Sequence, residues 1–227
     1  ARNVAQAAAL FGAAMLYEGG GTDVFEGEQF IQSHATGGFA LLIEKDGHDR
    51  YQAISRSQAS AGPQGVALVL DQGGNDEYEL LDSSKVIPSA QLPDHSLSMG
   101  QGAATGLRAT FADGHSVAGG IGLLIDRAGN DRYTAQVFAQ GAGYYRGLGA
   151  LIDGGGHDHF MGRWYVQGAA AHEAAAVLLK RGEGNDSYTA THSTSIGAAH
   201  DESVAVFVDE GGDDAYELGH LGLGAAN

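Results

Sequence analysis

The chain has 227 residues, of which 28 are acidic and 12 basic, and its formal net charge is −16 at pH 7. This charge disfavours nucleic acid and anionic membrane surfaces as partners and favours cations or basic proteins, because polyanions are bound through basic surfaces. The sequence holds no run of about 18 apolar residues and therefore predicts no membrane-spanning helix. Its lack of cysteine excludes disulfides and thiolate metal sites.

The first expected element is a helix at the N-terminus. Residues 1–17 are rich in Ala, Leu and Met, lack proline, and end at a run of three glycines, which is typical of a helix and its stop signal. An uncovered coil end would leave backbone groups unpaired. We therefore expect residues 1–18 to form a capping helix on a repeat domain that fills residues 19–227.

From residue 23 onward the chain repeats a short phrase, a tight turn followed by Asp, any residue, and then Tyr or Phe. The successive Asp residues are separated by 26, 27, 55, 27, 28 and 28 positions. A period of this length indicates a solenoid, in which each repeat buries its apolar face against its neighbours. The Asp residues of the phrase are Asp23, Asp49, Asp76, Asp131, Asp158, Asp186 and Asp214.

Each repeat also holds a segment of alternating apolar residues that ends five positions before the Asp. A period of two with many β-branched residues is typical of strands, and the spacing leaves little room for crossover helices. We predict an all-β fold, a right-handed parallel β-helix (β-solenoid) with six to seven coils of 27–28 residues. The segments are 38–44, 65–71, 120–126, 147–153 and 203–209, and a poorer match is 175–181.

The gap of 55 positions corresponds either to two periods or to one repeat enlarged by insertions. Residues 81–97 contain Pro88 and Pro93, so we expect a loop insertion there. If the whole gap is an insertion, the coil count is six.

Alternate residues of each strand point to the same face, and one of these two sets of residues (one parity) is expected to face the core. We assign to the core the parity with three apolar positions per strand, such as Phe39, Leu41 and Ile43. The opposite parity also carries a large apolar residue in each coil, and a solvent-facing column of this kind predicts either a covering loop or a protein partner, including self-association. The column consists of Leu42, Val69, Leu124, Leu151 and Phe207.

Stacking of the repeats brings acidic residues into columns. A second acid stands five positions before the Asp of the phrase at Glu44, Asp71, Asp126, Asp153 and Asp209, and Arg181 is expected to interrupt this second column, with Lys180 level with Ile152.

Carboxylates about 5 Å apart repel by on the order of a kcal/mol or more per pair, and a divalent cation with oxygen ligands removes this penalty. The acidic columns therefore predict bound calcium. The alternative is that each Asp accepts hydrogen bonds from its own turn. The predicted metal ligands are Asp71, Asp76, Asp126, Asp131, Asp153, Asp158, Asp186, Asp209 and Asp214.

The turns at 74–78, 129–133 and 184–188 read Gly-Asn-Asp-x-Tyr. They resemble the later part of the calcium-binding nonapeptide of repeats-in-toxin (hemolysin-type) proteins, Gly-Gly-x-Gly-x-Asp-x-apolar-x. Here the motif occurs once per 27 or 28 residues, whereas that family places consecutive nonapeptides on both sides of a short coil. The resemblance implies an extracellular or cell-surface protein whose β-roll holds calcium (Ca²⁺) between successive turns.

Three further columns carry chemistry. Aromatic residues two positions after each Asp predict a core spine, with a carbohydrate platform as the alternative. Glutamines nine positions after the Asp, together with Gln101, predict a structural corner. The aromatic residues are Phe25, Tyr51, Tyr78, Tyr133, Phe160, Tyr188 and Tyr216, and the glutamines are Gln32, Gln58, Gln101, Gln140 and Gln167.

Histidines also repeat, since His172 and His200 are each followed by an acid, Glu173 and Asp201. A stacked pair of this kind can hold a transition metal or serve as acid and base, although we expect no catalysis there. His192 and His220 form a second pair with the same spacing.

The sequence contains no Walker-type loop, nucleophile elbow or zinc-helix motif, and no catalytic residue is predicted. The ladders and the apolar column favour a structural or adhesive repeat module, stabilised by calcium, that mediates assembly or surface interactions. The alternative, drawn from the fold alone, is a polysaccharide-binding or polysaccharide-degrading parallel β-helix protein.

Overall fold

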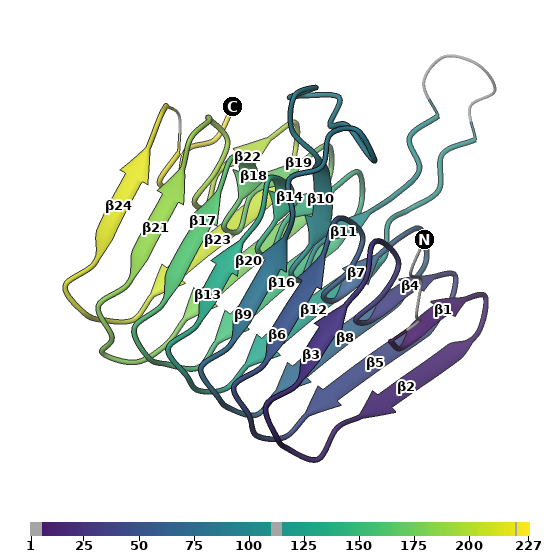
Figure 1. The fold of residues 1–227 in the computed structure, drawn as a ribbon. Helices are drawn as coiled ribbons and strands as arrows, with labels where there is room; N and C mark the ends of the chain where they lie inside the picture. The colour runs from purple at the N-terminus through teal and green to yellow at the C-terminus, as the bar shows by residue number, and fades with distance from the viewer. Residues whose placement is uncertain (1–5, 110–114, 221) are drawn as a thin grey trace.

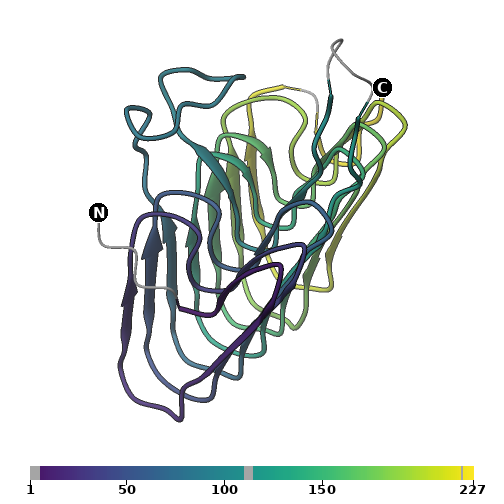
Figure 2. The same ribbon diagram turned by 90° about the vertical axis from the view of Figure 1, so that its right-hand side faces the viewer.

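The computed structural model describes residues 6–109, 115–220 and 222–227. These residues form strands, turns and bends without a helix, and they wind into a parallel β-solenoid of seven stacked coils and the start of an eighth (Figures 1 and 2). The all-β, parallel solenoid expected from the repeat period is therefore confirmed. The coil count is slightly higher than the six to seven predicted, because the segment expected to be a capping helix contributes strands to the first coil.

Three seven-stranded sheets run the length of the solenoid, and every strand pair within them is parallel. We call the first the long-strand sheet, because most of its strands have six residues. In spatial order it consists of β2 (Ala13–Tyr17), β5 (Phe39–Glu44), β8 (Val66–Asp71), β12 (Ile121–Asp126), β16 (Leu148–Asp153), β20 (Ala175–Lys180) and β23 (Val204–Asp209).

A tight turn at the end of each long strand leads into the second sheet, which carries the aromatic residues of the repeat and is called the aromatic sheet. It consists of β3 (Val24–Glu26), β6 (Arg50–Ala53), β9 (Glu77–Leu80), β13 (Arg132–Thr134), β17 (His159–Gly162), β21 (Ser187–Ala190) and β24 (Ala215–Leu218).

The remaining strands are short and close each coil. The third sheet consists of β1 (Ala8–Leu10), β4 (His34–Thr36), β7 (Ser60–Ala61), β11 (Ala104–Thr105), β15 (Gly143–Tyr144), β19 (Ala170–Ala171) and β22 (Ala199–His200). A fourth sheet of three strands consists of β10 (Leu97–Gly100), β14 (Val137–Ala139) and β18 (Trp164–Val166).

The predicted N-terminal capping helix is wrong. Within residues 1–18, residues 1–5 lie outside the described residues, and the segment that follows forms β1 and β2, which pair with β4 and β5. Residues 13–17 are all hydrophobic and pair residue by residue with Phe39 to Ile43. Pairing with an existing sheet edge outweighs the intrinsic helix preference of alanine, which is worth less than about 1 kcal/mol per residue.

The gap of 55 residues is a single enlarged coil, because β9 and β13 pair directly and Tyr78 stands opposite Tyr133. Two excursions leave the body of the solenoid within this coil (Figure 1). One spans residues 81–96, with an antiparallel bridge between Pro88 and Ser96. The other, which the sequence does not signal, leaves after β11, and a bridge between Leu107 and Val117 joins its two arms.

The core lies on the strand parity opposite to the one predicted. Leu42, Leu124 and Leu151 are fully buried, whereas Phe39 and Ile121 are 41% and 44% exposed. Leu42, Val69, Leu124 and Leu151 therefore pack inside the solenoid, and Phe207, in the last long strand, is partly buried against the same cluster. Both faces of these strands carry apolar residues. The inward-facing residues end in an acid, such as Glu44 or Asp71, and this acid led the sequence analysis to assign their face to solvent.

The aromatic column forms a spine through the core, as predicted. Rings in successive coils stack with centroids 4.7–5.0 Å apart and planes within 8° of parallel, from Phe25 to Tyr216. Five of these rings are 0–1% exposed, so the column offers no platform for a carbohydrate. Its hydroxyl groups point instead toward the acidic residues described below.

The glutamine column forms the corner after the aromatic sheet. Gln140 is fully buried and adopts a left-handed backbone conformation with φ of 57°. Its Nε2 donates to the carbonyl oxygen of Tyr133 in its own coil at 3.2 Å and to that of Met161 in the next coil at 3.0 Å. Gln32, Gln58, Gln101 and Gln167 repeat this arrangement, so the glutamines tie neighbouring coils together through the backbone.

We expect Gln140→Ala to lower the free energy of unfolding by roughly 2–4 kcal/mol, because it removes two hydrogen bonds to backbone carbonyl groups of neighbouring coils and opens a cavity. Chemical denaturation monitored by circular dichroism measures this change. The exposed Gln72 provides the control, since its replacement by alanine should change stability by about 0.5 kcal/mol or less. Equal effects of the two substitutions would mean that the corner bonds do not stabilise the fold.

Candidate metal centre

Two columns of ionisable side chains meet where each long strand turns into the aromatic sheet. The strand-end column is formed by the last residue of each long strand, and strand pairing places its members in register. The turn column is formed by the Asp of the repeated phrase, five residues later in most coils and six residues after Lys180. The strand-end column consists of Glu44, Asp71, Asp126, Asp153, Lys180 and Asp209.

The residue that interrupts the strand-end column is Lys180, not Arg181. Lys180 is paired with Asp153 in the preceding coil and with Asp209 in the following coil, and Leu179 is the residue level with Ile152. Arg181 lies one position farther on, in the exposed turn. The sequence alignment of this coil was therefore displaced by one residue.

The turn column is linked from coil to coil through the backbone. The Oδ1 atom of Asp131 accepts a hydrogen bond from the backbone N–H of Asp76 at 2.7 Å, and Asp158 accepts from Asp131 in the same way at 2.6 Å. The same bond joins every consecutive pair from Asp23 to Asp214. The expectation that each Asp accepts from its own turn is therefore wrong for this column, because the donor lies one coil earlier.

The second carboxylate oxygen of several Asp residues in the turn column has no hydrogen-bond partner in the described part of the chain. The Oδ2 atoms of Asp49, Asp76 and Asp131 are buried without a hydrogen-bond partner among the described residues, and so is Oε2 of Glu44. These four residues are at most 3% exposed. A buried carboxylate oxygen without a partner is costly, so each one requires a proton or a cation beside it.

The strand-end column is better satisfied. One oxygen of Asp71 accepts from the backbone N–H of Gly73 in its own turn at 3.2 Å. The other lies 2.9 Å from the hydroxyl groups of Tyr51 and Tyr78, and the Tyr78 hydroxyl lies at the same distance from Oδ2 of Asp126, so it bridges the two acids. The spine therefore supplies hydroxyl donors to the acids, and the hydrogen bonds from the acid's own turn that the sequence suggested do occur in this column.

The two columns come together in four groups whose potential ligand atoms lie within 4.8 Å of one another. All nine predicted ligands fall in three of these groups. The fourth group combines Asp71 with Glu44 and Asp49, two residues that the sequence analysis placed in the columns but not among the ligands. The groups are Glu44, Asp49 and Asp71; Asp71, Asp76 and Asp126; Asp131, Asp153 and Asp158; and Asp186, Asp209 and Asp214.

Glu18 extends the strand-end column at the N-terminal coil. It directly follows β2, and its backbone N–H donates to the carbonyl oxygen of Ile43, the residue before Glu44. The sequence interpretation missed it because this segment was taken as a helix. The glycine turn that follows Glu18, like those after the other long strands, was the signal that could have found it.

Burial shifts the titration of these acids upward. It raises the pKa of Glu44 to about 8, and that of Asp76 to about 7, with a further contribution from the charge of Asp71 in both cases. Burial likewise raises the pKa of Asp131 to about 9, although the backbone N–H of Asp76 opposes the shift. At neutral pH Glu44 and Asp131 therefore retain protons unless a cation replaces them.

Lys180 shows how the columns accommodate a positive charge. Its ammonium group is fully buried and lies 3.0 Å from Oδ2 of Asp158, 3.5 Å from Oδ2 of Asp186 and 3.5 Å from Oδ1 of Asp153. It contacts the Oδ2 atoms of Asp158 and Asp186. The equivalent Oδ2 atoms of Asp49, Asp76 and Asp131, in other coils, have no hydrogen-bond partner within the described ranges. Burial by itself lowers the pKa of Lys180. The carboxylates of Asp153 and Asp158 raise this pKa by more than burial lowers it, so the net shift is upward.

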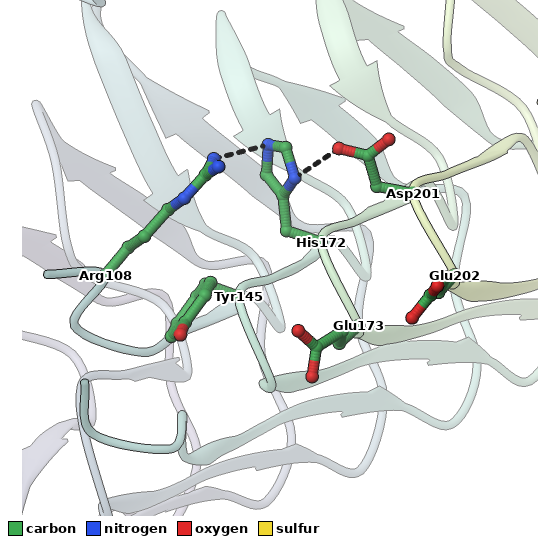
Figure 3. Close-up of a pocket in the computed structure, with 6 residues that line it drawn as sticks. All are labelled: Arg108, Tyr145, His172, Glu173, Asp201 and Glu202. Carbon is green, nitrogen blue, oxygen red and sulfur yellow. Dashed lines mark hydrogen bonds and ion pairs between the residues drawn. The ribbon is translucent and has the colours of Figure 1, made fainter. Parts of the chain in front are cut away.

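A second group of ionisable residues lines a surface hollow of about 230 Å³ (Figure 3). Nδ1 of His172 lies 2.6 Å from Oδ2 of Asp201, and Nε2 of His172 lies 3.2 Å from Nη1 of Arg108. His200 approaches the same Asp201 at 3.5 Å, so the structure brings the predicted His172 and His200 pair together with its acid.

Both ring nitrogens of His172 are engaged in this hollow. Burial and the guanidinium of Arg108 lower the pKa of His172, which favours a neutral ring that donates from Nδ1 to Asp201 and accepts from Arg108 at Nε2. A ring in this state has no free nitrogen with which to take a proton from a substrate. The geometry therefore describes a polar network on the surface.

The remaining histidine pair is less organised. His192 stacks on Trp164, with ring centroids 5.8 Å apart, and its Nδ1 lies 2.9 Å from Oγ1 of Thr191. His220 lies in the exposed bend that follows β24.

The acidic columns thus form the strongest candidate site, with buried oxygen donors repeated along the solenoid and an ammonium group in the coil that lacks one acid. Comparisons with protein-family models, with curated proteins and with solved structures give no match for this chain.

Proposed function

We propose that the protein is a rigid structural or adhesive module whose solenoid is stabilised by calcium ions bound along the acidic columns. The observation that carries this proposal is the repeated unpartnered oxygen, at Asp49, Asp76 and Asp131, together with the ammonium of Lys180 at the equivalent oxygens of Asp158 and Asp186. Where the chain supplies its own cation the acids are neutralised. Where it does not, a dissolved cation is expected.

Calcium suits these donors better than the other common metals. The columns offer only oxygen ligands, and calcium takes six to eight of them at about 2.3–2.6 Å in flexible geometry. Two such bonds span about 4.6–5.2 Å, which accommodates acids whose ligand atoms lie within 4.8 Å of one another. Zinc and copper favour nitrogen and sulfur ligands, which are absent from these groups.

A structural role follows from where the charge is buried. The acids lie inside the solenoid, where a bound ion neutralises repulsion between coils and joins one coil to the next. The polysaccharide alternative has less support, because the aromatic column suggested for carbohydrate binding is buried, and in the hollow that does carry exposed acids both ring nitrogens of His172 are engaged. The resemblance to repeats-in-toxin turns supports an extracellular or cell-surface location, where calcium is abundant, and the general preference of parallel crossovers supports right-handed winding.

Thermal unfolding tests calcium binding directly. We expect the midpoint at pH 7.5 to rise by about 10 °C or more between excess EDTA and millimolar calcium, because an ion that binds only the folded state stabilises it by mass action. Magnesium at the same concentration should have a smaller effect, since it demands tighter octahedral geometry. Equal midpoints in EDTA and in calcium would rule out calcium as the stabilising ion.

Isothermal titration calorimetry of Asp131→Asn gives the matched control. The amide retains the shape of the side chain and can still accept from the N–H of Asp76, but it withdraws one charged oxygen from the group formed with Asp153 and Asp158. We expect fewer or weaker calcium sites in this variant. Asp46→Asn, at an exposed turn, should leave the titration unchanged.

A further inference from the structure

The outer face of the long-strand sheet is apolar along its whole length. In each of its strands the outward positions are the first, third and fifth residues, and all of them are apolar from β2 to β23. At the first of these positions Phe39 is 41% exposed, Ile121 44% and Val204 63%. The seven strands lie side by side (Figure 1), so these residues form one continuous patch, called here the outer apolar face.

The outer apolar face contrasts with the rest of this acidic chain. The chain has a net charge of −16, yet none of the outward positions in the long-strand sheet carries a charge. The ladders from β5 to β23 are also paired over all six residues without a bulge. A regular, uncharged apolar surface of this kind is what a second sheet packs against.

The size of the face matches one side of a small dimer interface. Strands about 4.8 Å apart and about 3.3 Å long per residue give seven strands of six residues a face of roughly 30 by 20 Å, or on the order of 600 Å². The largest apolar patch on a typical monomer is about 300–600 Å², and patches of this size mark interaction sites. Two copies would bury roughly 1,200 Å², which is at the lower end of stable protein interfaces.

We propose that the outer apolar face is the contact between two copies of this chain, packed sheet on sheet about 10 Å apart around a two-fold axis. A two-fold arrangement needs only one surface, and this face is uniform enough to complement itself. A basic partner would leave its charges unpaired against apolar side chains, and an anionic membrane would be repelled by the acidic chain. This inference identifies the partner in the assembly role proposed above, and it does not depend on which ion fills the acidic columns.

Sedimentation velocity in millimolar calcium, over about 1–100 µM protein, tests the contact through the concentration dependence of mass. We expect the wild-type chain to form dimers. Leu123 occupies the middle outward position of β12, the central strand of the sheet, so Leu123→Lys places a charge at the centre of the interface. This substitution should weaken dimerisation roughly 100-fold or more, because the charge would be buried without a partner.

Met161→Lys is the matched control. Met161 is 47% exposed on β17 of the aromatic sheet, so the same charge is added outside the outer apolar face, and dimerisation should be unchanged. Should Leu123→Lys fail to fold by circular dichroism, Ile121→Lys tests the same face at a more exposed position. A folded wild-type chain that stays monomeric throughout, or dimers that persist in the folded lysine variant, would overturn the inference.

The same samples separate this inference from the calcium proposal. A calcium-dependent rise in the unfolding midpoint of monomeric Leu123→Lys would support the ion sites irrespective of dimerisation. Dimers in a chain whose midpoint ignores calcium would support the interface and reject the ion. Binding of the wild-type chain to vesicles of neutral phospholipid, with loss of binding in Leu123→Lys and no dimer in solution, would assign the face to a lipid surface and overturn the dimer.

Discussion

Replacing Lys180 by methionine is expected to lower the free energy of unfolding by about 3–5 kcal/mol at pH 8 in EDTA, which is the usual cost of breaking a buried ion pair from one side. The ammonium group lies within 3.5 Å of oxygens on Asp153, Asp158 and Asp186, and methionine keeps much of its volume without its charge. Chemical denaturation measures the loss. Lowering the pH, or adding calcium, should restore part of it, because a proton or an ion can then take the place of the ammonium.

Arg181→Met is the control for Lys180→Met. It removes the same charge one residue away, but Arg181 lies in the exposed turn, so its loss should cost about 1 kcal/mol or less. If the two variants lose the same stability, the buried ammonium does not neutralise the acids.

Lys180→Asp restores the acid that the strand-end column has in the neighbouring coils. In EDTA this variant should be less stable than Lys180→Met, because it adds a further carboxylate to the group. In calcium it should bind at least one ion more than the wild-type chain, as counted by calorimetry.

Stability in the absence of divalent ions should fall as the pH rises from about 5 to about 9. The pKa values of Asp76, Glu44 and Asp131 are raised by burial to about 7, 8 and 9 in the folded protein. A group whose pKa is higher when folded binds protons preferentially in the folded state, so its contribution to stability is full below its unfolded pKa and is lost as the pH passes its folded pKa. Thermal unfolding in EDTA across this range measures the slope.

Saturating calcium should reverse or flatten this pH dependence. Metal binding requires deprotonated carboxylates, so the stabilisation by calcium should increase with pH while that by protons decreases. Asp131→Asn removes one group with a raised pKa and should reduce the slope measured in EDTA. A midpoint in EDTA that is constant between pH 5 and pH 9 would contradict the raised pKa values, and a calcium effect independent of pH would contradict binding at these acids.

The period of the sequence was enough to predict the architecture. Repetition of Asp and of Tyr or Phe at 26–28 residues placed Tyr51, Tyr78 and Tyr133 in one spine, and the structure stacks their rings. Stacking is a consequence of period alone, since equivalent residues in successive coils of a solenoid must lie above one another. The same period predicts that the acids form columns along the solenoid.

The side of the strand that faces inward could not be predicted from alternation. In β5 the outward residues Phe39, Leu41 and Ile43 are all large and apolar, whereas the inward residues are Ala40, Leu42 and Glu44. A rule that buries the larger residues and exposes the charged one therefore gives the inverted answer. The inversion arises because the protein places its acids in the interior and leaves an apolar sheet outside, which is the opposite of the usual distribution.

Local sequence was also a poor guide at the irregular coils. Residues 13–17 have helical composition but complete a sheet, because strand pairing with β5 is a long-range interaction that propensity does not register. The single-residue displacement at Lys180 arose because the turn after this strand is one residue longer than in the neighbouring coils. Asp186 lies six positions after Lys180, whereas Asp158 lies five after Asp153, so a fixed offset from the Asp pointed to Arg181. Only the three-dimensional register resolves such positions.

The hydrogen bonds of the turn column give the solenoid a direction of growth. The backbone N–H of Asp76 finds its acceptor on Asp131, and that of Asp131 finds its acceptor on Asp158, so each turn is completed by the coil that follows it in the chain. A polypeptide that emerges N-terminus first therefore always has one unfinished turn at its leading edge, about one repeat behind the newest residue. Each new coil closes the turn before it and leaves its own open until the next coil is added.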